Sequence, residues 1–464
     1  MAEGELKRAL GFWPTWAMCL GLVSCSTTLM MLSMGFGDLG AGFTGTHLLA
    51  LAYIILVCLA FSELATMYPK ASSLELFTSK AFGRLAGITV GLWYGFKDVF
   101  GFPAESTICG IILGHFFPQV PWWGWAILVL TIFMIVNMLG IVVAGYAQLA
   151  MLIFMVGSYL AIGVIALVLG KPNWDYLSQT FFSPPASSLY PGTPAGFPSV
   201  AVLMLMGVWL FIGMEVAAPL AEEIKNPART IPLAMTTSMV TLFAVEQFTG
   251  LSWAATVPRE VLLSEPYHVG VAEYLLRLTG GVWFALVSLM ATGTTINSVM
   301  AGATRVLYGM SREGYLPKVF GWLHPRFRTP WGSLGILYAL MVIIIVSAAT
   351  FLGVEAPFKL ALCCSFVFTV IYLIMFVNVV ALRIKRPQDP RPFKMGGPFK
   401  APILAIIGAI ATLLILIYTV APPYGSVDVL IYGGTYSIAL LIVAAAIYYV
   451  KARKLSSESE GLTP

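Results

Sequence analysis

The chain has 464 residues, of which 59% are hydrophobic and 10% charged, and its mean hydropathy is +0.89. Soluble domains carry about 25% charged residues, so this composition excludes a soluble protein and indicates an integral membrane protein. Long uninterrupted apolar runs predict an all-α membrane fold, because a membrane β-barrel would show ten-residue alternating segments. The net charge of +5 does not indicate nucleic-acid binding, since the basic residues lie mainly between the apolar runs.

The reactive residue types show no pattern typical of a catalytic or metal site. The six cysteines all lie in apolar runs without disulfide or metal-binding spacing, so we expect free buried thiols and no metal or other cofactor. Neither a nucleophile elbow nor a phosphate-binding loop occurs, which disfavours an enzyme. The first apolar run is too long for a cleavable signal and is expected to continue into a membrane span.

A helix needs about 20 predominantly apolar residues to cross a bilayer. This criterion predicts twelve transmembrane helices, near residues 13–36, 45–68, 84–114, 122–144, 146–170, 197–221, 231–257, 280–310, 330–352, 358–383, 402–421 and 427–450. The longest connections are too short to form a soluble domain. The chain 1–464 is therefore expected to be a single transmembrane domain.

Lysine and arginine residues are distributed unevenly between the two sides of these predicted spans. If the N-terminus is cytoplasmic, 21 of the 26 basic residues fall on the cytoplasmic side and four on the opposite side, while Lys97 lies inside a span. Basic residues accumulate in cytoplasmic loops. Both termini are therefore expected to be cytoplasmic, in a multi-pass protein of the cell membrane.

Polar and flexible residues interrupt the first and sixth spans. The first span carries four hydroxyl side chains, those of Ser24, Ser26, Thr27 and Thr28. The sixth contains Gly207, Gly213, Glu215 and Pro219. Matching breaks in two halves of a chain indicate the central site of a transporter, because irregular backbone at membrane depth lines a cavity. For the first span, ordinary packing by Ser and Thr is an equally good explanation.

The third span places three charges in the apolar stretch GLWYGFKDVFGFPAE, residues 91–105. Asp98 and Glu105 are seven residues apart on one helical face, which we expect to line the interior. The Lys97 side chain projects about 100° away from that of Asp98 around the helix. The alternative explanation for Lys97 is that it neutralises an acid through a neighbouring helix. Glu246 in the seventh span is either a partner of Lys97 or a deep residue of the outer half.

Three other stretches are long and specific. They are SELATMYPKASSLELFTSKAFGRLAG at 62–87, AEEIKNPARTIPLA at 221–234 and NSVMAGATRVLYGMSREGYLPKVFGWLHPRFRTPWGS at 297–333. All three resemble the amino acid–polyamine–organocation (APC) permeases. The resemblance implies a LeuT-like fold with two inverted five-span repeats, here 13–170 and 197–383, broken first and sixth helices, and two accessory helices in 402–450. It also implies transport of amino acids, amines or polyamines by proton-coupled symport or by exchange.

Shorter stretches resemble particular members of that family. WLFIGME at 209–215 is similar to the arginine/agmatine antiporters, which implies that Trp209 closes the site toward the outside and that Glu215 senses protons. The sixth span and KDVFGFPA at 97–104 also resemble ethanolamine permeases. In that likeness, Asp98 corresponds to an acidic residue in the third span of those permeases.

The sequence departs from the family at two places. Amino acid carriers usually have Gly-x-Gly at the break in span one, where bare amides hold the substrate carboxylate. We expect Leu29–Met31 at the corresponding positions, and their bulk would hinder a carboxylate. The fifth span lacks the lysine of some proton-coupled members, so that mechanism is not expected. Sodium stays a second candidate ion, because Thr294, Thr295 and Ser298 lie where sodium-coupled relatives hold it.

These observations predict a secondary transporter of a small amine or amino acid, with Asp98 pairing with the substrate ammonium. Trp209 is expected to cover the cation, a contact worth about 0.5–2 kcal/mol, and Glu215 to couple transport to protons. The other predicted substrate contacts are Ser26, Thr27, Thr28, Leu29, Met30, Phe211, Ile212 and Asn297. A neutral amino acid permease of the same fold, a non-transporting receptor and an amine channel are the alternatives. The sequence leaves the oligomeric state open.

Overall fold

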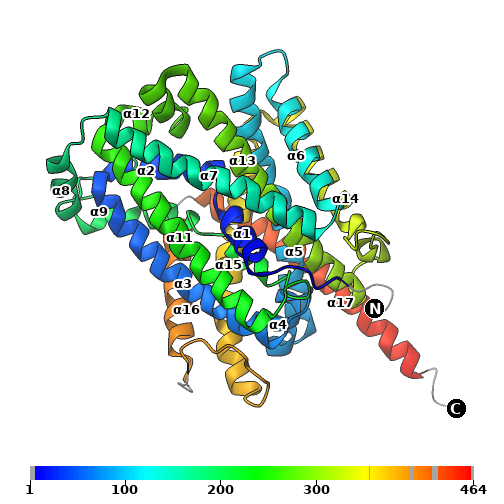
Figure 1. Cartoon of the computed structure of the whole chain (residues 1–464). Helices are drawn as coiled ribbons and strands as arrows, with labels where there is room; N and C mark the ends of the chain where they lie inside the picture. The colour runs from blue at the N-terminus through cyan, green and yellow to red at the C-terminus, as the bar shows by residue number, and fades with distance from the viewer. Residues whose placement is uncertain (1–5, 355, 398–400, 421–426, 461–464) are drawn as a thin grey trace.

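Figure 1 shows a computed structural model of the chain, which describes residues 6–354, 356–397, 401–420 and 427–460. Within these residues the protein is a bundle of helices, and its β pairing is an isolated bridge between Leu10 and Ile224. Most long helices run along one diagonal of the view. The N-terminus and α4 (Leu74–Phe82) lie toward the lower right, and α8 (Trp174–Phe182) lies toward the upper left.

The remaining helices fall into two groups along the chain. The first group is α1 (Phe12–Val23), α2 (Ser26–Leu39), α3 (Phe43–Met67), α5 (Arg84–Phe116), α6 (Trp122–Met138) and α7 (Ile141–Leu169). The second group is α9 (Phe197–Val202), α10 (Met204–Trp209), the 3₁₀ turn η2 (Met214–Ala217), α11 (Pro227–Thr256), α12 (Arg259–Leu263), α13 (His268–Arg312), α14 (Trp331–Ser347), α15 (Ala356–Lys385), α16 (Ile403–Val420) and α17 (Val427–Glu460).

Nine segments of the described residues are long and apolar enough to cross a membrane, and three shorter apolar helices accompany them. One of the nine, Ser26–Met67, has 42 residues. As a single helix it would measure about 63 Å, twice the roughly 30 Å of a bilayer core. Gly40, with φ 56°, and the 3₁₀ turn Gly40–Gly42 divide it into α2 and α3. The chain is thus a multi-pass membrane protein, and the number of twelve spans stays a prediction.

Several predicted span boundaries agree with the observed helices, and the helices that were not predicted are short. The third predicted span, 84–114, corresponds to α5. The connection 258–279 between two predicted spans contains α12 and the first turns of α13. Arg277, with φ 55°, interrupts α13 just before the predicted start of the eighth span. Helices as short as α12 do not produce a long apolar run, so hydropathy does not detect them.

The first span is broken at Ser24 and Cys25, beside the hydroxyl residues that the sequence indicated. Ser24 (ψ 55°) and Cys25 (ψ 170°) leave the helical conformation between α1 and α2. The Ser24 hydroxyl donates to Leu20 O at 2.9 Å and the Thr28 hydroxyl donates to Val23 O at 2.7 Å. Both carbonyls also accept a backbone amide, from Ser24 N and Cys25 N, so the hydroxyls add a second hydrogen bond at the end of α1. The expectation of a break at Leu29–Met31 is wrong, because good helix formers there continue α2 without interruption.

The second break lies between α10 and η2. Gly213 has φ 129°, a conformation that residues with side chains rarely adopt. A Cβ atom at this position would lie 2.0 Å from Leu22 of α1. The Gly213 amide donates instead to the Tyr372 hydroxyl at 3.2 Å. Glycine therefore allows the irregular part of the sixth span to pack directly against the end of α1, so that the two breaks lie together.

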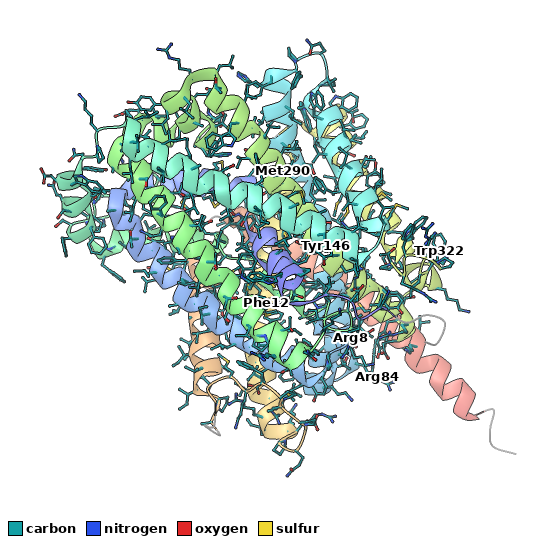
Figure 2. The ribbon with its side chains drawn as sticks, in the orientation of Figure 1. Arg8, Phe12, Arg84, Tyr146, Met290 and Trp322 are labelled. Carbon is teal, nitrogen blue, oxygen red and sulfur yellow. The ribbon has the colours of Figure 1, made fainter. Side chains whose placement is uncertain are left out.

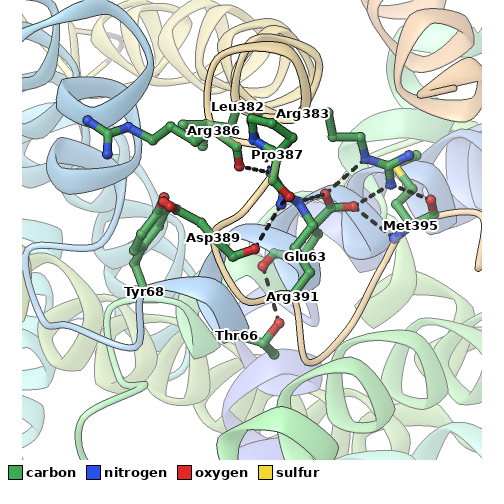
Figure 3. A network of polar contacts seen from close by, with 10 residues as sticks. All are labelled: Glu63, Thr66, Tyr68, Leu382, Arg383, Arg386, Pro387, Asp389, Arg391 and Met395. Carbon is green, nitrogen blue, oxygen red and sulfur yellow. Dashed lines mark hydrogen bonds and ion pairs between the residues drawn. The ribbon is translucent and has the colours of Figure 1, made fainter. Parts of the chain in front are cut away.

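Ion pairs connect the helix ends on the side of the bundle where the N-terminus lies. Glu63 of α3 is buried and pairs with Arg383 of α15 at 2.5 Å and with Arg391 at 3.4 Å (Figure 3). The Tyr68 hydroxyl donates to Asp389 beside this network. These contacts hold the segment that follows α15 against the end of α3.

Basic residues are frequent at the same end of the bundle. Figure 2 labels Arg8 and Arg84 close to the N-terminus, beside α4. The ion pairs of Arg383 and Arg391 also lie at the ends of α3 and α15 on this side. The arrangement agrees with the uneven distribution of basic residues in the sequence.

Glu75 of α4 provides a test of this side of the fold. Burial raises the pKa of Glu75 from 4.5 to about 7, with Glu313 adding to the effect and Ser79 and Lys451 opposing it. As pH rises from 4.5 to about 7, the unfolded chain releases the proton while the folded chain retains it. The free energy of unfolding therefore falls by about 3 kcal/mol across this pH range.

We expect Glu75→Gln to remove this loss. The variant should unfold at a higher temperature than the wild type near pH 8, and at a similar temperature near pH 4.5, in thermal unfolding of the detergent-solubilised protein followed by tryptophan fluorescence. Glu260→Gln, which removes an exposed carboxyl group, serves as the control. A stabilisation by Glu75→Gln that does not change with pH would contradict the prediction.

Candidate functional site

A small cavity lies where the two broken helices meet. Its volume is about 40 Å³, which is room for about three water molecules. The lining residues come from α1, α5, α13, α15 and the two breaks, namely Leu22, Cys25, Gly101, Phe102, Glu105, Trp209, Ile212, Thr295, Cys364 and Phe368. The wall is mostly apolar and aromatic, and its ionisable carboxyl group is that of Glu105.

Glu105 places a carboxylate at the start of α2. Its Oε1 accepts a hydrogen bond of 2.5 Å from the Thr27 hydroxyl. The backbone amides of Ser26 and Thr27 also lie near the carboxylate, in the first turn of α2, where a helix attracts anions. Its Oε2 is buried without a hydrogen-bond partner among the described residues. Glu105 therefore keeps one oxygen free to accept a further bond.

Trp209 and Thr27 close one side of the cavity. The Trp209 indole Nε1 donates to the Thr27 hydroxyl at 3.2 Å, so Thr27 connects Trp209 to Glu105. A second, larger cavity of about 410 Å³ begins on the other side of Thr27. Its lining residues are Ser26, Thr27, Met30, Ile108, Ile111, Ile112, Glu265, Pro266, Tyr267 and His268. A thin layer of side chains thus separates the central cavity from this vestibule.

A thicker layer closes the side that holds the N-terminus. Arg305 of α13 and Glu223 form a buried ion pair at 2.7 Å. The backbone carbonyl of Glu223 accepts from the amides of Ala9 and Leu10, both at 2.8 Å, and Lys225 N donates to Leu10 O at 2.7 Å. The central cavity is therefore closed on both sides in this conformation, more heavily toward the N-terminus.

Asp98 does not line the central cavity. Both of its oxygens accept from the Lys97 ammonium at 2.7 Å, and both residues are 1% exposed. The ammonium also lies over the rings of Tyr94 and Phe368, at 4.2 and 3.9 Å from the centroids. Lys97 and Asp98 thus neutralise each other directly within α5. Recognition of a substrate ammonium by Asp98 stays a prediction, and the geometry favours Glu105.

Glu215 lies in η2, inside the second break, and is fully buried. Its Oε2 accepts from the Tyr372 hydroxyl of α15 at 2.8 Å, and its Oε1 has no hydrogen-bond partner among the described residues. A carboxylate only accepts hydrogen bonds, whereas the protonated acid also donates one. Glu215 can therefore change the bonding of this segment when its protonation changes.

Eight acids are buried among the described residues, and four of them, Asp98, Glu105, Glu215 and Glu246, fall into two classes. Asp98 is paired with Lys97, and Glu246 of α11 is paired with His47 of α3. Glu105 and Glu215 take part in none of the ion pairs found among the described residues. Because an isolated charge is costly to bury, these two carboxyl groups are the ones that favour a cation or a proton.

Other predicted contacts lie away from the central cavity. Asn297 donates to Ala144 O and Gln148 and accepts from Asn137, which engages its whole amide between helices. Leu29 is fully buried within α2, and Phe211 packs on His47. In this conformation Asn297, Leu29 and Phe211 do not line the central cavity, whereas Trp209 and Ile212 do. Their contact with a substrate stays a prediction.

The hydroxyl residues considered for sodium bind the protein itself. Thr295 Oγ1 lies 3.3 and 3.2 Å from the carbonyls of Gly21 and Leu22, and Ser298 Oγ donates to Met18 O at 3.1 Å. Thr294 Oγ1 donates within its own helix, to Ala291 O. These contacts join α13 to α1 directly.

Sequence reasoning missed the wall formed by α15. Cys364 and Phe368 line the cavity, and a Cβ atom on Gly101 of α5 would lie 2.8 Å from the Cys364 sulfur. Nothing in the uniformly apolar sequence of this helix distinguishes the residues that face the cavity. The close approach at Gly101 is the one feature that could have indicated the contact.

Residues 10–449 match the family model described as amino acid permease. The chain belongs to the amino acid permease family. It is similar to the branched-chain amino acid permease BcaP of Bacillus subtilis, with 23% identity over 98% of this chain and 95% of that one. It is also similar to the uncharacterized transporter lpg1691 of Legionella pneumophila, with 26% identity over 81% of this permease and 82% of that protein.

A solved structure supports the fold of this permease. The manganese transporter of Eremococcus coleocola superposes with a TM-score of 0.58, covering 94% of this chain and 92% of that chain at 13% identity. At this identity the likeness concerns the fold alone. Together with the family, it supports a helical membrane transporter fold.

The Lys97–Asp98 pair can be tested by its effect on stability. Lys97→Met leaves a buried aspartate without its partner, and breaking a buried ion pair in this way costs about 3–5 kcal/mol. The double variant Lys97→Met/Asp98→Asn removes both charges and should recover most of that loss. Thermal unfolding of the purified variants measures both effects. Equal stability of the single and double variants would show that the pair does not form.

Proposed function

We propose that this permease is a secondary transporter of a small, positively charged amine, which it moves by alternating access. The observation that carries the proposal is the unpaired carboxylate of Glu105 in an aromatic cavity between two broken helices. Its family and the branched-chain amino acid permease among its relatives support transport of amino acids or amines.

The ammonium group of the substrate would bind between Glu105 and Trp209. Glu105 Oε2 accepts a charge-assisted hydrogen bond, and Trp209 and Phe102 offer aromatic faces for the cation. A cation here would neutralise an otherwise unpaired buried carboxylate. The small volume, about 40 Å³, favours a substrate with few heavy atoms in this conformation.

The start of α2 argues against a substrate that carries a carboxylate. A broken helix offers free amides and a positive dipole end to an anion. In this permease Glu105 already supplies the anion, beside the amides of Ser26 and Thr27. A second carboxylate at the same place would meet like charge. The exclusion thus rests on Glu105 and not on the bulk of Leu29–Met31.

Glu215 is the group that we propose couples transport to protons. It is buried, has one unpaired oxygen, and lies in the break that must rearrange when the cavity opens. The two protonation states bond differently to Tyr372 and would favour different conformations. Sodium coupling is less favoured, because Thr295 and Ser298 donate to protein carbonyls.

The proposal includes an orientation and an architecture. The predominance of basic residues on the N-terminal side favours a cytoplasmic N-terminus and C-terminus, so that the vestibule beside Thr27 faces outward. Residues 13–170 and 197–383 would form two inverted repeats, with 402–450 as accessory helices. The breaks in α1/α2 and α10/η2, which start these halves, support that division.

A neutral amino acid permease is the second candidate, and the relationship to BcaP favours it. In that case the substrate would approach the cavity with Glu105 protonated. A receptor or a channel of the same fold would show no saturable counterflow. Uptake into proteoliposomes separates these possibilities: labelled ethanolamine should accumulate and exchange, and excess alanine should compete weakly. Alanine transport without competition by amines would overturn the amine proposal.

Glu105→Gln should weaken amine binding about 30-fold or more, because a buried charge partner is worth about 2 kcal/mol or more. The matched control is Lys97→Met/Asp98→Asn, which removes a neutral pair close to the site and should change affinity by less than about threefold. Competition binding to the purified variants measures both. If the control loses amine binding and Glu105→Gln does not, Asp98 recognises the ammonium.

Glu215→Gln should abolish accumulation of the amine under an imposed pH gradient and retain one-for-one exchange, because the glutamine cannot release a proton. Replacing sodium with potassium should change neither activity in the wild type. Proteoliposome uptake with and without the gradient is the measurement. Undiminished accumulation by Glu215→Gln would exclude this residue as the coupling group.

A further inference from the structure

A second group of ionisable residues is buried between α3 and α11, away from the central cavity. His47 Nε2 lies 3.1 Å from Glu246 Oε2, and both side chains are 0% exposed. His47 lies one turn from the start of α3, so the pair is in the half of the bundle opposite the N-terminus. The central cavity and the proposed amine contacts do not use either residue.

The hydrogen bonds around His47 fix the number of protons that the pair holds. Gln247 Nε2 donates to Thr44 Oγ1 at 2.5 Å, so Gln247 Oε1 is turned toward His47 Nδ1 at 3.1 Å. Oε1 accepts only, so with the amide in this orientation His47 Nδ1 carries a proton. The contact between His47 Nε2 and Glu246 then needs a second proton, on either the ring or the carboxyl group.

Loss of that second proton would leave a lone pair of His47 Nε2 facing a lone pair of the Glu246 carboxylate. The neutral histidine can restore the bond to the Glu246 carboxylate only by moving its remaining proton to Nε2. Nδ1 then becomes an acceptor, and the Gln247 amide must turn over to donate to it, with the Thr44 hydroxyl donating in place of accepting. The hydrogen bonds that connect Thr44, Gln247, His47 and Glu246 thus have opposite donor–acceptor directions in the two protonation states.

The surroundings leave this network incomplete. Glu246 Oε1 and the Tyr159 hydroxyl of α7 are buried without hydrogen-bond partners among the described residues. From a neighbouring helix, Tyr159 interacts electrostatically with Glu246, whereas burial and His47 are the influences on Glu246 itself. A purely structural polar network is expected to be fully satisfied. The unused hydrogen-bonding capacity beside Glu246 is consistent with a group that changes its protonation.

The pair contacts the segment that closes the central cavity. The His47 ring stacks on Phe211, with centroids 5.0 Å apart and planes at 22°, and lies 4.8 Å from the Phe243 ring. Phe211 follows Trp209 by two residues and precedes Gly213 in the irregular part of the sixth span. A change in the charge or tilt of the His47 ring therefore acts directly on the backbone that carries Trp209.

We propose that His47 and Glu246 form a proton-binding site that controls, through Phe211, the opening of Trp209 toward the vestibule. The proposal rests on the transport function proposed above, and it assigns to this pair the response to pH on the vestibule side. Glu215 remains the group that couples net accumulation to protons. One proton enters or leaves the pair, and when it leaves, the proton that remains on His47 moves from Nδ1 to Nε2, so that one N–H bond breaks and another forms.

The variants that test this site are Glu246→Gln and His47→Gln, which remove one titrating group each. Thr249→Val is the matched control, because it removes a buried hydrogen bond to Tyr159 O on the same helix without changing a titratable group. Ethanolamine exchange is measured in proteoliposomes between about pH 5 and pH 8, the range in which histidine changes charge. Exchange mode needs no net accumulation, so it is independent of coupling through Glu215.

We expect exchange by the wild type and by Thr249→Val to vary severalfold across this range. Exchange by Glu246→Gln and His47→Gln should become independent of pH. Wild-type pH profiles in both variants would overturn the proposal. Absence of exchange in the wild type with every amine would refute the proposed function and not the proton site, which the following measurement tests without substrate.

The chain contains four histidines, so NMR of ¹⁵N-histidine-labelled protein can follow each ring. The ring signal missing from His47→Gln should change with pH in the wild type and in Thr249→Val. In Glu246→Gln its titration should be displaced or lost. This result decides the question where a variant loses exchange altogether. A His47 signal that is constant over the whole range would overturn the proposal.

Discussion

The cost of burying an unpaired charge governs the organisation of this permease. In the low dielectric of the bundle interior, an ionised side chain requires a partner or must take up a proton. Lys97 and Asp98 meet this requirement within one helix, and His47 and Glu246 meet it across two helices. Glu105 and Glu215 do not meet it within the described protein. They lie at the two breaks, so the uncompensated charge is concentrated where the conformation must change.

The backbone imposes the complementary constraint. Each break frees amides and carbonyls that the membrane cannot hydrate, and nearby groups take up most of them. Hydroxyls of Ser24 and Thr28 add a second hydrogen bond to carbonyls at the end of α1, and Tyr372 serves the amide of Gly213. Glu105 stabilises the amide end of α2. The same carboxylate that completes the helix end is then available to a cation, which joins local structure to recognition.

The sequence predicted the membrane class, most helix positions and the presence of both breaks, because apolar length and helix-breaking residues are local properties. The register of the first break could not be derived from pattern alone, since Ser24 and Cys25 differ little from Ser26–Thr28 in side-chain chemistry. Helical geometry separated Lys97 from Asp98 by about 100°, yet the long lysine side chain bends back to its neighbour. Which acid remains unpaired depends on three-dimensional packing, which pairs Asp98 with Lys97 and leaves Glu105 without an ion-pair partner among the described residues.

The Thr27 hydroxyl is shared by two groups with different tasks. It donates to Glu105 and accepts from Trp209, so its proton points to the carboxylate as long as that carboxylate needs a donor. In the proposed function, a cation at Glu105 would compete with the Thr27 hydroxyl for the carboxylate, and a change in the Thr27 side-chain torsion χ1 would move the accepting oxygen away from the indole. Occupancy of the cavity would then reach Trp209 through one torsion angle of one side chain.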